Sequence, residues 1–244
     1  MLQDVLKRFK FMCILLILPF SISVADAPNN FAAAKKIALA LFGENHVTLY
    51  CGCEFDSNKK VDLTSCNMHT ATPIERANRI EWEHMMPAAS FGRYHRCWTE
   101  NLCVNEATGK EYKGRKCCDK IDADFKRVEA ELYNLWPAVG LINQARSNFK
   151  FSVIPNKRGY YGCAFDVDKE ARTAEPPARA KGIVARANLF MADKYSVEIS
   201  EEERALLNLW NKKYPPGVWE LQWAENVASI VGYTNPYIEE HQLA

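Results

Sequence analysis

The stretch Arg-Ile-Glu-Trp-Glu-His at residues 79–84, followed by Pro87, decides the fold that we expect for this chain. Its apolar residues Ile80 and Trp82 alternate with two glutamates, which predicts a short β-strand with one apolar and one acidic face. His84 ends the alternation. Pro87 disfavours a helix that would continue from His84 through residue 87, because proline lacks an amide donor. The pattern therefore places a glutamate and a histidine side by side where a strand meets a loop.

Outside this stretch, the sequence predicts mainly helices. Apolar residues recur every three or four positions in each of them, and capping residues stand at their starts. The predicted elements are helices over 29–42 (capped by Asn29 or Asn30), 122–135 (ended by Pro137), 178–195 and from Ser200 (with Glu203 in a capping box), an extended segment over 47–55, and a loop over 91–119. The expected fold class is α+β and mostly helical, with long loops that disulfides hold.

The first residues are not expected to belong to the folded domain. Three basic residues near the N-terminus precede an almost wholly apolar run over 11–22, and small residues follow at 23–25. These features are typical of a secretory signal peptide, so we expect residues 1–25 to be removed and residues 26–244 to form one domain. A membrane anchor is the alternative, but the apolar run is shorter than the roughly 20 residues that a spanning helix needs.

Export determines how the cysteines are interpreted. Of the nine cysteines, Cys13 lies in the expected signal peptide, which leaves an even number. An even number of cysteines in an oxidising compartment indicates disulfides. The remaining residues are Cys51, Cys53, Cys66, Cys97, Cys103, Cys117, Cys118 and Cys163. A zinc site is the alternative, although the spacings of its candidates match zinc sites poorly, these being Cys51, Cys53, Cys117 and Cys118.

Charge is unevenly distributed along the chain. The net charge is +1, but residues 75–190 hold 20 Lys and Arg against 15 Asp and Glu, whereas residues 191–244 hold 4 against 9. A basic middle beside an acidic tail indicates a localised binding site for a polyanion.

His84 is the strongest candidate for chemistry among the five histidines. A neutral imidazole can take a proton from water, which phosphodiester hydrolysis requires. The reaction also needs a cation that offsets charge in the transition state, and magnesium prefers carboxylate and amide oxygens. Glu83, Glu129 and Asn143 could supply such oxygens. If the fold does not bring them together, Glu129 is an exposed helix carboxylate and Asn143 a turn or cap residue.

Short motifs match those of a known protein family, in the same order, over nearly the whole chain that follows the expected signal peptide. They are residues 79–84, Pro87-Ala88, Phe91-Gly92, Cys97-Trp98, Gly114-Arg115-Lys116, Glu129-Ala130-Glu131, Asn134-Leu135, Pro137-Ala138, Gly140, Asn143, Arg146-Ser147-Asn148, Pro176-Pro177, Arg179-Ala180, Trp210-Asn211-Lys212, Tyr214-Pro215 and Asn235-Pro236-Tyr237. In these motifs the sequence resembles the bacterial endonuclease I family of periplasmic and secreted nucleases. The resemblance implies a ββα-metal (His-Me finger) core with additional helices.

The resemblance also implies roles for five residues. His84 would be the general base, and Glu83 and Asn143 would bind the metal. Glu129 resembles the acidic residue that supports the metal site. Arg115 resembles the arginine that neutralises the scissile phosphate, a role that suits its permanently charged, planar fork.

The expected function follows from the same resemblance. The protein would be an exported, monomeric, metal-dependent endonuclease, periplasmic or secreted and free of the membrane after signal cleavage. It would use Mg²⁺, or alternatively Mn²⁺ or Ca²⁺. Its substrate would be the backbone of DNA and RNA, cut without regard for sequence because contacts to phosphate carry no base information.

One departure from the family concerns the loop that carries Arg115. Residues 102–113 look inserted, and the C-terminal cysteines that family members usually carry are absent from the sequence. We therefore expect a local disulfide between Cys103 and Cys117 that holds this loop. If this loop is placed differently, the scissile phosphate could instead be bound by Arg93, Arg96 or Lys116. Arg146 and Arg179 could each contact a further backbone phosphate or form a salt bridge within the protein.

Two other functions remain open at the level of the sequence. A carboxylate pair, Glu81 with Glu83 or Glu129 with Glu131, could serve an enzyme that cleaves polysaccharides. A secreted binding module with a basic face would need neither these carboxylates nor His84. A zinc protease is disfavoured further because the motif His-Glu-x-x-His does not occur.

Overall fold

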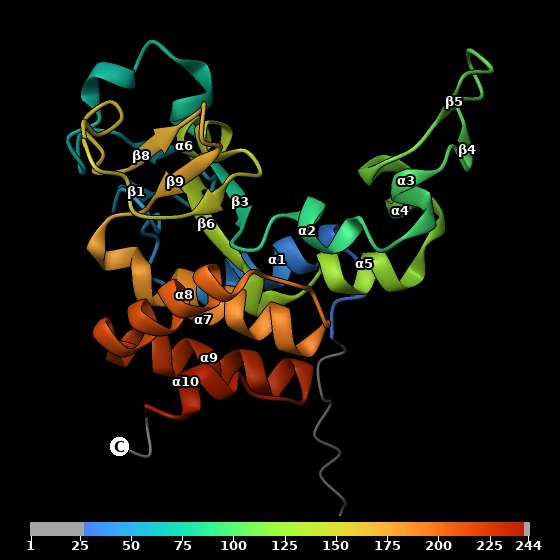
Figure 1. Cartoon of the computed structure of the whole chain (residues 1–244). Helices are drawn as coiled ribbons and strands as arrows, with labels where there is room; N and C mark the ends of the chain where they lie inside the picture. The colour runs from blue at the N-terminus through green and yellow to red at the C-terminus, as the bar shows by residue number, and fades with distance from the viewer. Residues whose placement is uncertain (1–26, 242–244) are drawn as a thin grey trace, which may run out of the picture.

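The computed structural model of the chain describes residues 27–241 (Figure 1). The signal peptide expected over 1–25 lies outside these residues. Within the described part, none of the helices is long and apolar enough to cross a membrane. The architecture is mixed α+β, with many helices and several small sheets.

Two antiparallel strands and a helix lie at the centre of the fold. Strand β3 (Ile80–His84) pairs along its whole length with β6 (Leu135–Val139), and this confirms the strand predicted from the alternating pattern. Helix α6 (Gly140–Arg146) follows β6 directly and packs against both strands. Gly140 permits this close packing, because a Cβ atom there would lie 2.5 Å from the carbonyl oxygen of Arg76.

Helix α1 (Phe31–Phe42) packs near the same strands and confirms the first predicted helix. Asn30 caps it by accepting a hydrogen bond from the amide of Ala33 at 2.9 Å. The Phe42 ring lies 5.7 Å from Trp82 of β3 and 5.6 Å from Trp136 of β6, between ring centroids. The apolar face of the strand pair is therefore buried under aromatic side chains from α1.

Four helices from the C-terminal part of the chain form a layer beside the strand pair (Figure 1). They are α7 (Ala178–Lys194), α8 (Glu201–Lys213), α9 (Val218–Val231) and α10 (Pro236–Glu239). The helix predicted over 178–195 is confirmed, and so is the one expected from Ser200. The hydroxyl of Ser200 accepts from the amide of Glu203 at 3.2 Å, as a capping residue does.

The helix expected over 122–135 is shorter than predicted. Helix α5 (Ala123–Glu129) ends at Glu129, a 3₁₀ turn (Leu132–Asn134) follows, and β6 then begins. Pro137, which was expected to end the helix, lies inside β6, where its carbonyl oxygen accepts from the amide of Leu49 at 2.8 Å. The apolar spacing was misleading because buried residues of two consecutive elements happen to follow one helical period.

The predicted extended segment and the predicted loop contain several short elements. Only two residues of the segment 47–55 form a strand, and the loop over 91–119 holds three short helices and a hairpin. The elements are β1 (Glu54–Phe55), β2 (Val61–Asp62), η1 (His69–Ala71), η2 (Glu75–Asn78), α2 (Ala88–Gly92), α3 (Arg96–Thr99), β4 (Cys103–Val104), β5 (Glu111–Tyr112) and α4 (Arg115–Ile121). A further sheet has the order β7 (Lys150–Phe151), β9 (Thr173–Glu175), β8 (Asp166–Asp168).

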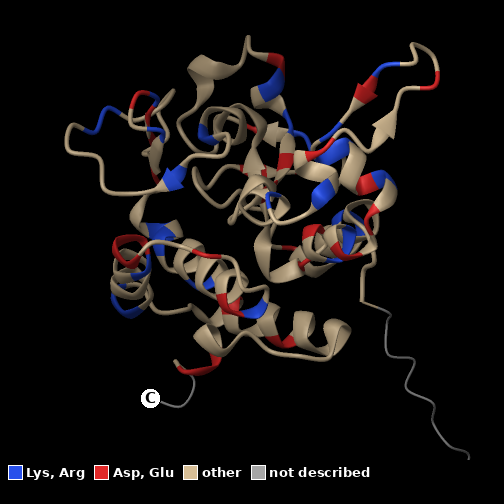
Figure 2. Ribbon diagram, turned by 45° about the vertical axis from the view of Figure 1, so that its right-hand side comes forward, with Lys and Arg blue, Asp and Glu red and all other residues tan. Residues whose placement is uncertain are grey.

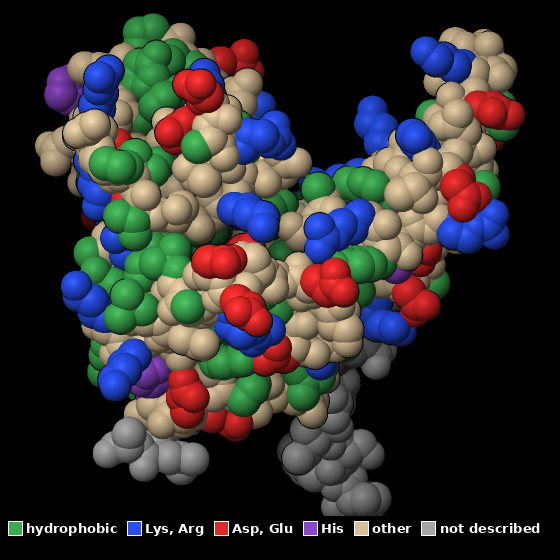
Figure 3. Space-filling view, viewed as in Figure 1, with side chains coloured by type: hydrophobic (Ala, Val, Ile, Leu, Met, Phe, Trp, Pro, Cys, Tyr) green, Lys and Arg blue, Asp and Glu red, His purple; other side chains and the backbone are tan. Residues whose placement is uncertain are grey.

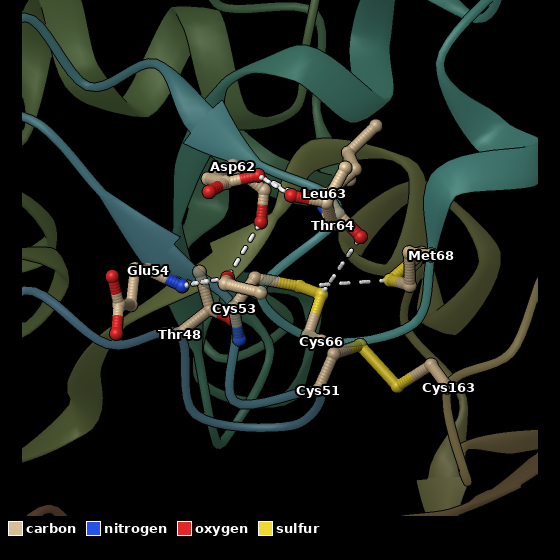
Figure 4. The surroundings of a disulfide bond; sticks show 11 residues. Thr48, Cys51, Cys53, Glu54, Asp62, Leu63, Thr64, Cys66, Met68 and Cys163 are labelled. Atoms are coloured by element: carbon tan, nitrogen blue, oxygen red, sulfur yellow. Dashed lines mark hydrogen bonds between the residues drawn. A yellow bond between two sulfur atoms is a disulfide. The ribbon is translucent and has the colours of Figure 1, made fainter.

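Four disulfides connect these short elements. Two of them, Cys51–Cys163 and Cys53–Cys66, lie close together under the β1–β2 hairpin (Figure 4). The other two are Cys97–Cys118 and Cys103–Cys117, and the second confirms the local bridge that we expected. The zinc alternative was wrong, because every one of its candidate cysteines is bonded to another cysteine.

Candidate active site

The side chains of β3 point in two directions. Glu81 and Glu83 share one face of the strand, and Trp82 and His84 share the other, because side chains alternate along a strand. The face with the glutamates lies against α6, whereas the face with His84 lies against α1. The neighbours Glu83 and His84 therefore contact different parts of the protein.

The ring of His84 is buried and held in one orientation. Its Nε2 atom lies 2.9 Å from the carbonyl oxygen of Glu129, and this nitrogen must donate because a carbonyl oxygen can only accept. The other nitrogen, Nδ1, then carries the lone pair of the neutral ring. Burial lowers the pKa of His84 to about 3, and the positive charge of Arg115 acts in the same direction. The imidazole is thus neutral and able to accept a proton at Nδ1.

Glu129 contacts two of the other predicted residues. It is the last residue of α5, and its carboxylate, 2% exposed, accepts from Nε of Arg115 at 2.5 Å. Its backbone carbonyl holds His84. Burial raises the pKa of the Glu129 carboxyl, and the guanidinium of Arg115 opposes that shift. Glu129 therefore positions both the imidazole and the guanidinium.

Arg115 begins α4 and has its side chain half exposed. The ring of Phe31 lies 5.2 Å from its guanidinium carbon and 4.8 Å from the centroid of His84. Its two terminal nitrogens make no hydrogen bond to the described residues, whereas Nε binds Glu129. The guanidinium is consequently held at one end and open to a ligand at the other.

Glu83 is buried among groups that balance its charge. Its Oε1 atom accepts from the hydroxyl of Tyr50 at 3.1 Å and from Arg146 at 2.9 Å. Arg146 is 1% exposed and also donates to the carbonyl oxygens of His84 and Met85. Burial raises the pKa of Glu83 to about 7, and the guanidinium of Arg146 opposes that shift. Of the two roles predicted for Arg146, the structure shows the internal salt bridge.

Asn143 lies on α6 and contacts Glu81. Its side-chain amide donates to Oε2 of Glu81 at 3.1 Å, and Arg76 holds both oxygens of Glu81 at 2.8 and 2.7 Å. Both residues line a hollow of about 610 Å³ that also reaches Arg115; we call it the Asn143 hollow. Asn143 thus opens to the same space as the guanidinium.

The predicted residues form two hydrogen-bonded groups, and Glu83 belongs to neither. One group holds His84, Glu129 and Arg115, and the other holds Asn143 with Glu81, whereas Glu83 binds Tyr50 and Arg146. No side-chain hydrogen bond joins Glu129 to Glu83 or Asn143 within residues 27–241, and no cluster of three or more His, Cys, Asp or Glu suited to a metal occurs there.

Glu83 and Asn143 nevertheless carry oxygen atoms of the kind that a hard cation prefers. Magnesium uses one or two carboxylates and retains several waters, so a cluster of three protein carboxylates is not needed. Glu83 offers Oε2, which has no hydrogen-bond partner among the described residues, and Asn143 offers its amide oxygen. The Asn143 hollow leaves room for water, and Glu83 is not among the residues that line it.

Two residues at this site, Glu81 and Lys35, were not predicted from the sequence to bind metal or phosphate. Glu81 shares a strand face with Glu83, and that signal was present in the alternating pattern. Lys35 of α1 lines the Asn143 hollow, with its Nζ atom 4.5 Å from the Phe31 centroid. Its spacing of four residues from Phe31 places the two on one helix face, but the sequence does not show that this face meets Arg115.

Several alternative phosphate ligands are engaged elsewhere. Arg93 donates to the carbonyl oxygen of Glu198 at 3.1 Å, and Arg96 pairs with Glu100 at 2.7 Å. Arg179 packs against Gly52, where a Cβ atom would collide with its guanidinium. Lys116, next to Arg115, is exposed and remains available.

We expect the buried, neutral state of His84 to give the protein a pH-dependent stability. The folded ring has a pKa of about 3 and the unfolded ring about 6.5, so acid protonates the unfolded chain first. The contribution of His84 is complete above pH ~6.5 and is lost as the pH falls toward ~3, at up to about 1.4 kcal/mol per pH unit.

Urea unfolding of wild type and His84→Ala from neutral to acidic pH measures this effect. The stability difference should shift against the wild type as the pH falls. A difference that stays constant over the whole range would contradict a depressed pKa.

Comparison with known proteins gives one consistent result. The family model described as Endonuclease I matches residues 32–242. An extracellular deoxyribonuclease of Aeromonas hydrophila is 38% identical over 221 residues, which cover 88% of this chain and 90% of the relative. A periplasmic deoxyribonuclease of the same species is 36% identical, with 88% of each chain covered. Endonuclease-1 of Buchnera aphidicola subsp. Acyrthosiphon pisum (strain APS) is 35% identical, over 87% of this chain and 82% of the relative. The chain therefore belongs to the bacterial endonuclease I family.

Proposed function

We propose that this exported nuclease, acting as a monomer in the periplasm or outside the cell, is a metal-dependent endonuclease that hydrolyses the phosphodiester backbone of DNA and RNA without regard for sequence. The observation that carries the proposal is the pair of contacts made by Glu129. Its backbone carbonyl binds the neutral imidazole of His84, and its carboxylate binds the guanidinium of Arg115, whose other end is open. The four disulfides fit an oxidising compartment, and the relatives named above are extracellular or periplasmic.

His84 acts as the general base in this proposal. Its Nδ1 atom takes a proton from water, the water oxygen bonds to phosphorus, and one bridging P–O bond breaks. The leaving oxygen keeps the bonding pair and takes a proton from solvent. The carbonyl of Glu129 keeps Nε2 protonated, so the free lone pair of the neutral ring lies on Nδ1 before the proton is taken. The lowered pKa keeps the ring unprotonated at physiological pH.

Arg115 binds the phosphate that is cut. Its terminal nitrogens donate to non-bridging oxygens and offset the charge that grows in the transition state. The carboxylate of Glu129 fixes the direction of the guanidinium, which lowers the entropy that binding would otherwise cost. Lys35 adds positive charge to the same hollow.

Glu83 and Asn143 are the residues that would hold the metal. A bound Mg²⁺, or alternatively Mn²⁺ or Ca²⁺, supplies positive charge that polarises the phosphate and stabilises the leaving oxygen. Arg146 and Tyr50 keep the Glu83 carboxylate in place through Oε1. Phosphate-directed contacts of this kind do not distinguish bases, which is why sequence indifference is expected.

Removal of divalent metal tests the proposal. We expect wild-type protein to cut supercoiled plasmid and a folded RNA, to lose both activities in excess EDTA, and to regain them when magnesium is restored. The assay follows the conversion of plasmid to nicked and linear forms on a gel. Cutting that persists in excess chelator would contradict the metal role, and cutting of plasmid without RNA would restrict the substrate to DNA.

A further inference from the structure

A hairpin of β4 and β5, residues 103–112, projects from the body of the protein (Figure 1). We call this hairpin the arm. Its tip is a turn in which Asn105 accepts from the amides of Ala107 and Thr108 at 3.0 and 3.2 Å. Apart from Cys103 and the partly buried Tyr112, its residues are exposed. The arm therefore contributes little to the core, and neither the fold nor the chemistry described above requires it.

The arm is nevertheless held firmly at its base. The disulfide Cys103–Cys117 ties its first strand to α4, and Lys113 donates to the carbonyl oxygen of Thr99 at 2.8 Å. At the tip, Glu106 reaches back to Lys120 of α4 at 3.4 Å. Such fixed placement is typical of a surface that binds something, because an unanchored loop loses more entropy on binding.

A hollow of about 680 Å³ lies between the arm and α4; we call it the arm hollow. Its lining includes Lys110, Lys113, Arg115, Lys116 and Lys120. Arg115 lines the Asn143 hollow as well. The arm hollow therefore begins where the proposed scissile phosphate binds and leads away from it.

Positive charge dominates this surface. Lys110, Lys113, Lys116 and Lys120 are exposed beside Arg115, against the two carboxylates of Glu106 and Glu111. Figure 2 marks basic residues on the helices at the foot of the arm, and Figure 3 shows Lys and Arg side chains along the open space between the arm and the body. A chain of phosphates that leaves Arg115 would meet this charge directly.

We infer that the arm and α4 form a second phosphate-binding wall, which holds the backbone of a long DNA substrate where it continues beyond Arg115. The inference rests on the proposed function, because the DNA must first place one phosphate at Arg115. The wall acts on substrate binding and not on the chemical step, since the arm contains none of the residues that take or give a proton. Short substrates consequently gain nothing from it.

The kinetics of the double variant Lys110→Ala/Lys120→Ala test the wall. Lys110 comes from the arm and Lys120 from α4. For a duplex of about 30 base pairs, roughly three helical turns, we expect KM to rise about 10-fold with kcat nearly unchanged. The slope of log KM against log salt should fall by about 2, since two phosphate contacts are lost. Hydrolysis of bis(p-nitrophenyl) phosphate, which is too small to reach the arm, should not change.

A variant of opposite sign excludes a merely structural effect. Glu106→Gln/Glu111→Gln removes the two negative charges of the arm and frees Lys120, so KM for the same duplex should fall. Lys169→Ala/Lys212→Ala serves as the matched control, because both lysines are exposed and neither lines the arm hollow. This control should leave KM unchanged.

Two outcomes would overturn the inference. One is an unchanged KM and salt slope in Lys110→Ala/Lys120→Ala, and the other is a higher KM in the glutamine variant. If Lys110→Ala/Lys120→Ala weakened RNA binding more than DNA binding, the wall would serve RNA, and this result would also contradict the inference. A failure of the proposed function looks different, since wild type would then cleave neither the duplex nor the small diester.

Discussion

Replacing His84 with alanine should lower the rate of plasmid cleavage by about 10²- to 10⁴-fold, the usual cost of losing a general base. The reason lies in the hydrogen bond from Nε2 to the Glu129 carbonyl, which leaves Nδ1 as the proton acceptor. The rate is measured as nicking of supercoiled plasmid at saturating magnesium. Because the ring is buried, circular dichroism and urea unfolding must show that the variant is folded.

His69→Ala is the matched control for this experiment. His69 is exposed in the turn η1 and contacts none of the candidate site residues in the described structure. Its replacement should leave the cleavage rate within about twofold, well under the loss that removal of a general base causes. A folded His84→Ala variant that keeps wild-type activity would mean that another group activates the water.

The Arg146→Met variant should lose about 3–5 kcal/mol of unfolding free energy, because removing one partner of a buried ion pair leaves the other charge without compensation. Three acceptors would lose a donor: the carbonyl oxygens of His84 and Met85, and the carboxylate of Glu83, which would keep only Tyr50. Urea unfolding without reductant measures the change while the disulfides remain intact. Cleavage should also fall, since these contacts fix the end of β3.

Two further variants separate charge from packing. Glu83→Gln/Arg146→Met removes both charges, so it should regain part of the lost stability. It should remain inactive, because Glu83 is a proposed metal ligand. Arg127→Met breaks an exposed pair with Asp124 and should cost less than about 1 kcal/mol. Equal losses in Arg146→Met and Arg127→Met would show that the buried pair adds no stability.

The parts of the fold that local patterns determine were predictable. The alternation around Trp82 gave β3, and the caps at Asn30 and Ser200 gave the starts of α1 and α8. Each signal depends on residues a few positions apart, whose preferences act without help from the rest of the chain. The bridge between Cys103 and Cys117 was also predictable, because Cys103 lies in the inserted segment and Cys117 follows it closely in sequence.

Features that depend on distant residues were not predictable in the same way. The stripe from Phe125 to Leu135 fits one helix in sequence, yet the chain leaves the helix at Glu129 so that β6 can pair with β3. Likewise, the pairing of Cys51 with Cys163 cannot be derived from their spacing.

The candidate site shows the same division. Resemblance to a family indicated which residues to consider, and the chain belongs to that family. Only the structure shows that Glu129 uses its carbonyl for His84 and its carboxylate for Arg115, and that Asn143 contacts Glu81. Hydrogen-bond partners far apart in sequence depend on packing, about which residue types alone say little.

The disulfide at the base of the arm has a consequence for resistance to proteases. An exposed tip such as residues 105–109 is a preferred site for proteolytic cleavage. Since Cys103 and Cys117 are covalently joined on either side of it, a cut there leaves both fragments attached. A molecule cleaved at the tip thus retains Arg115 on α4, and its two fragments stay covalently joined.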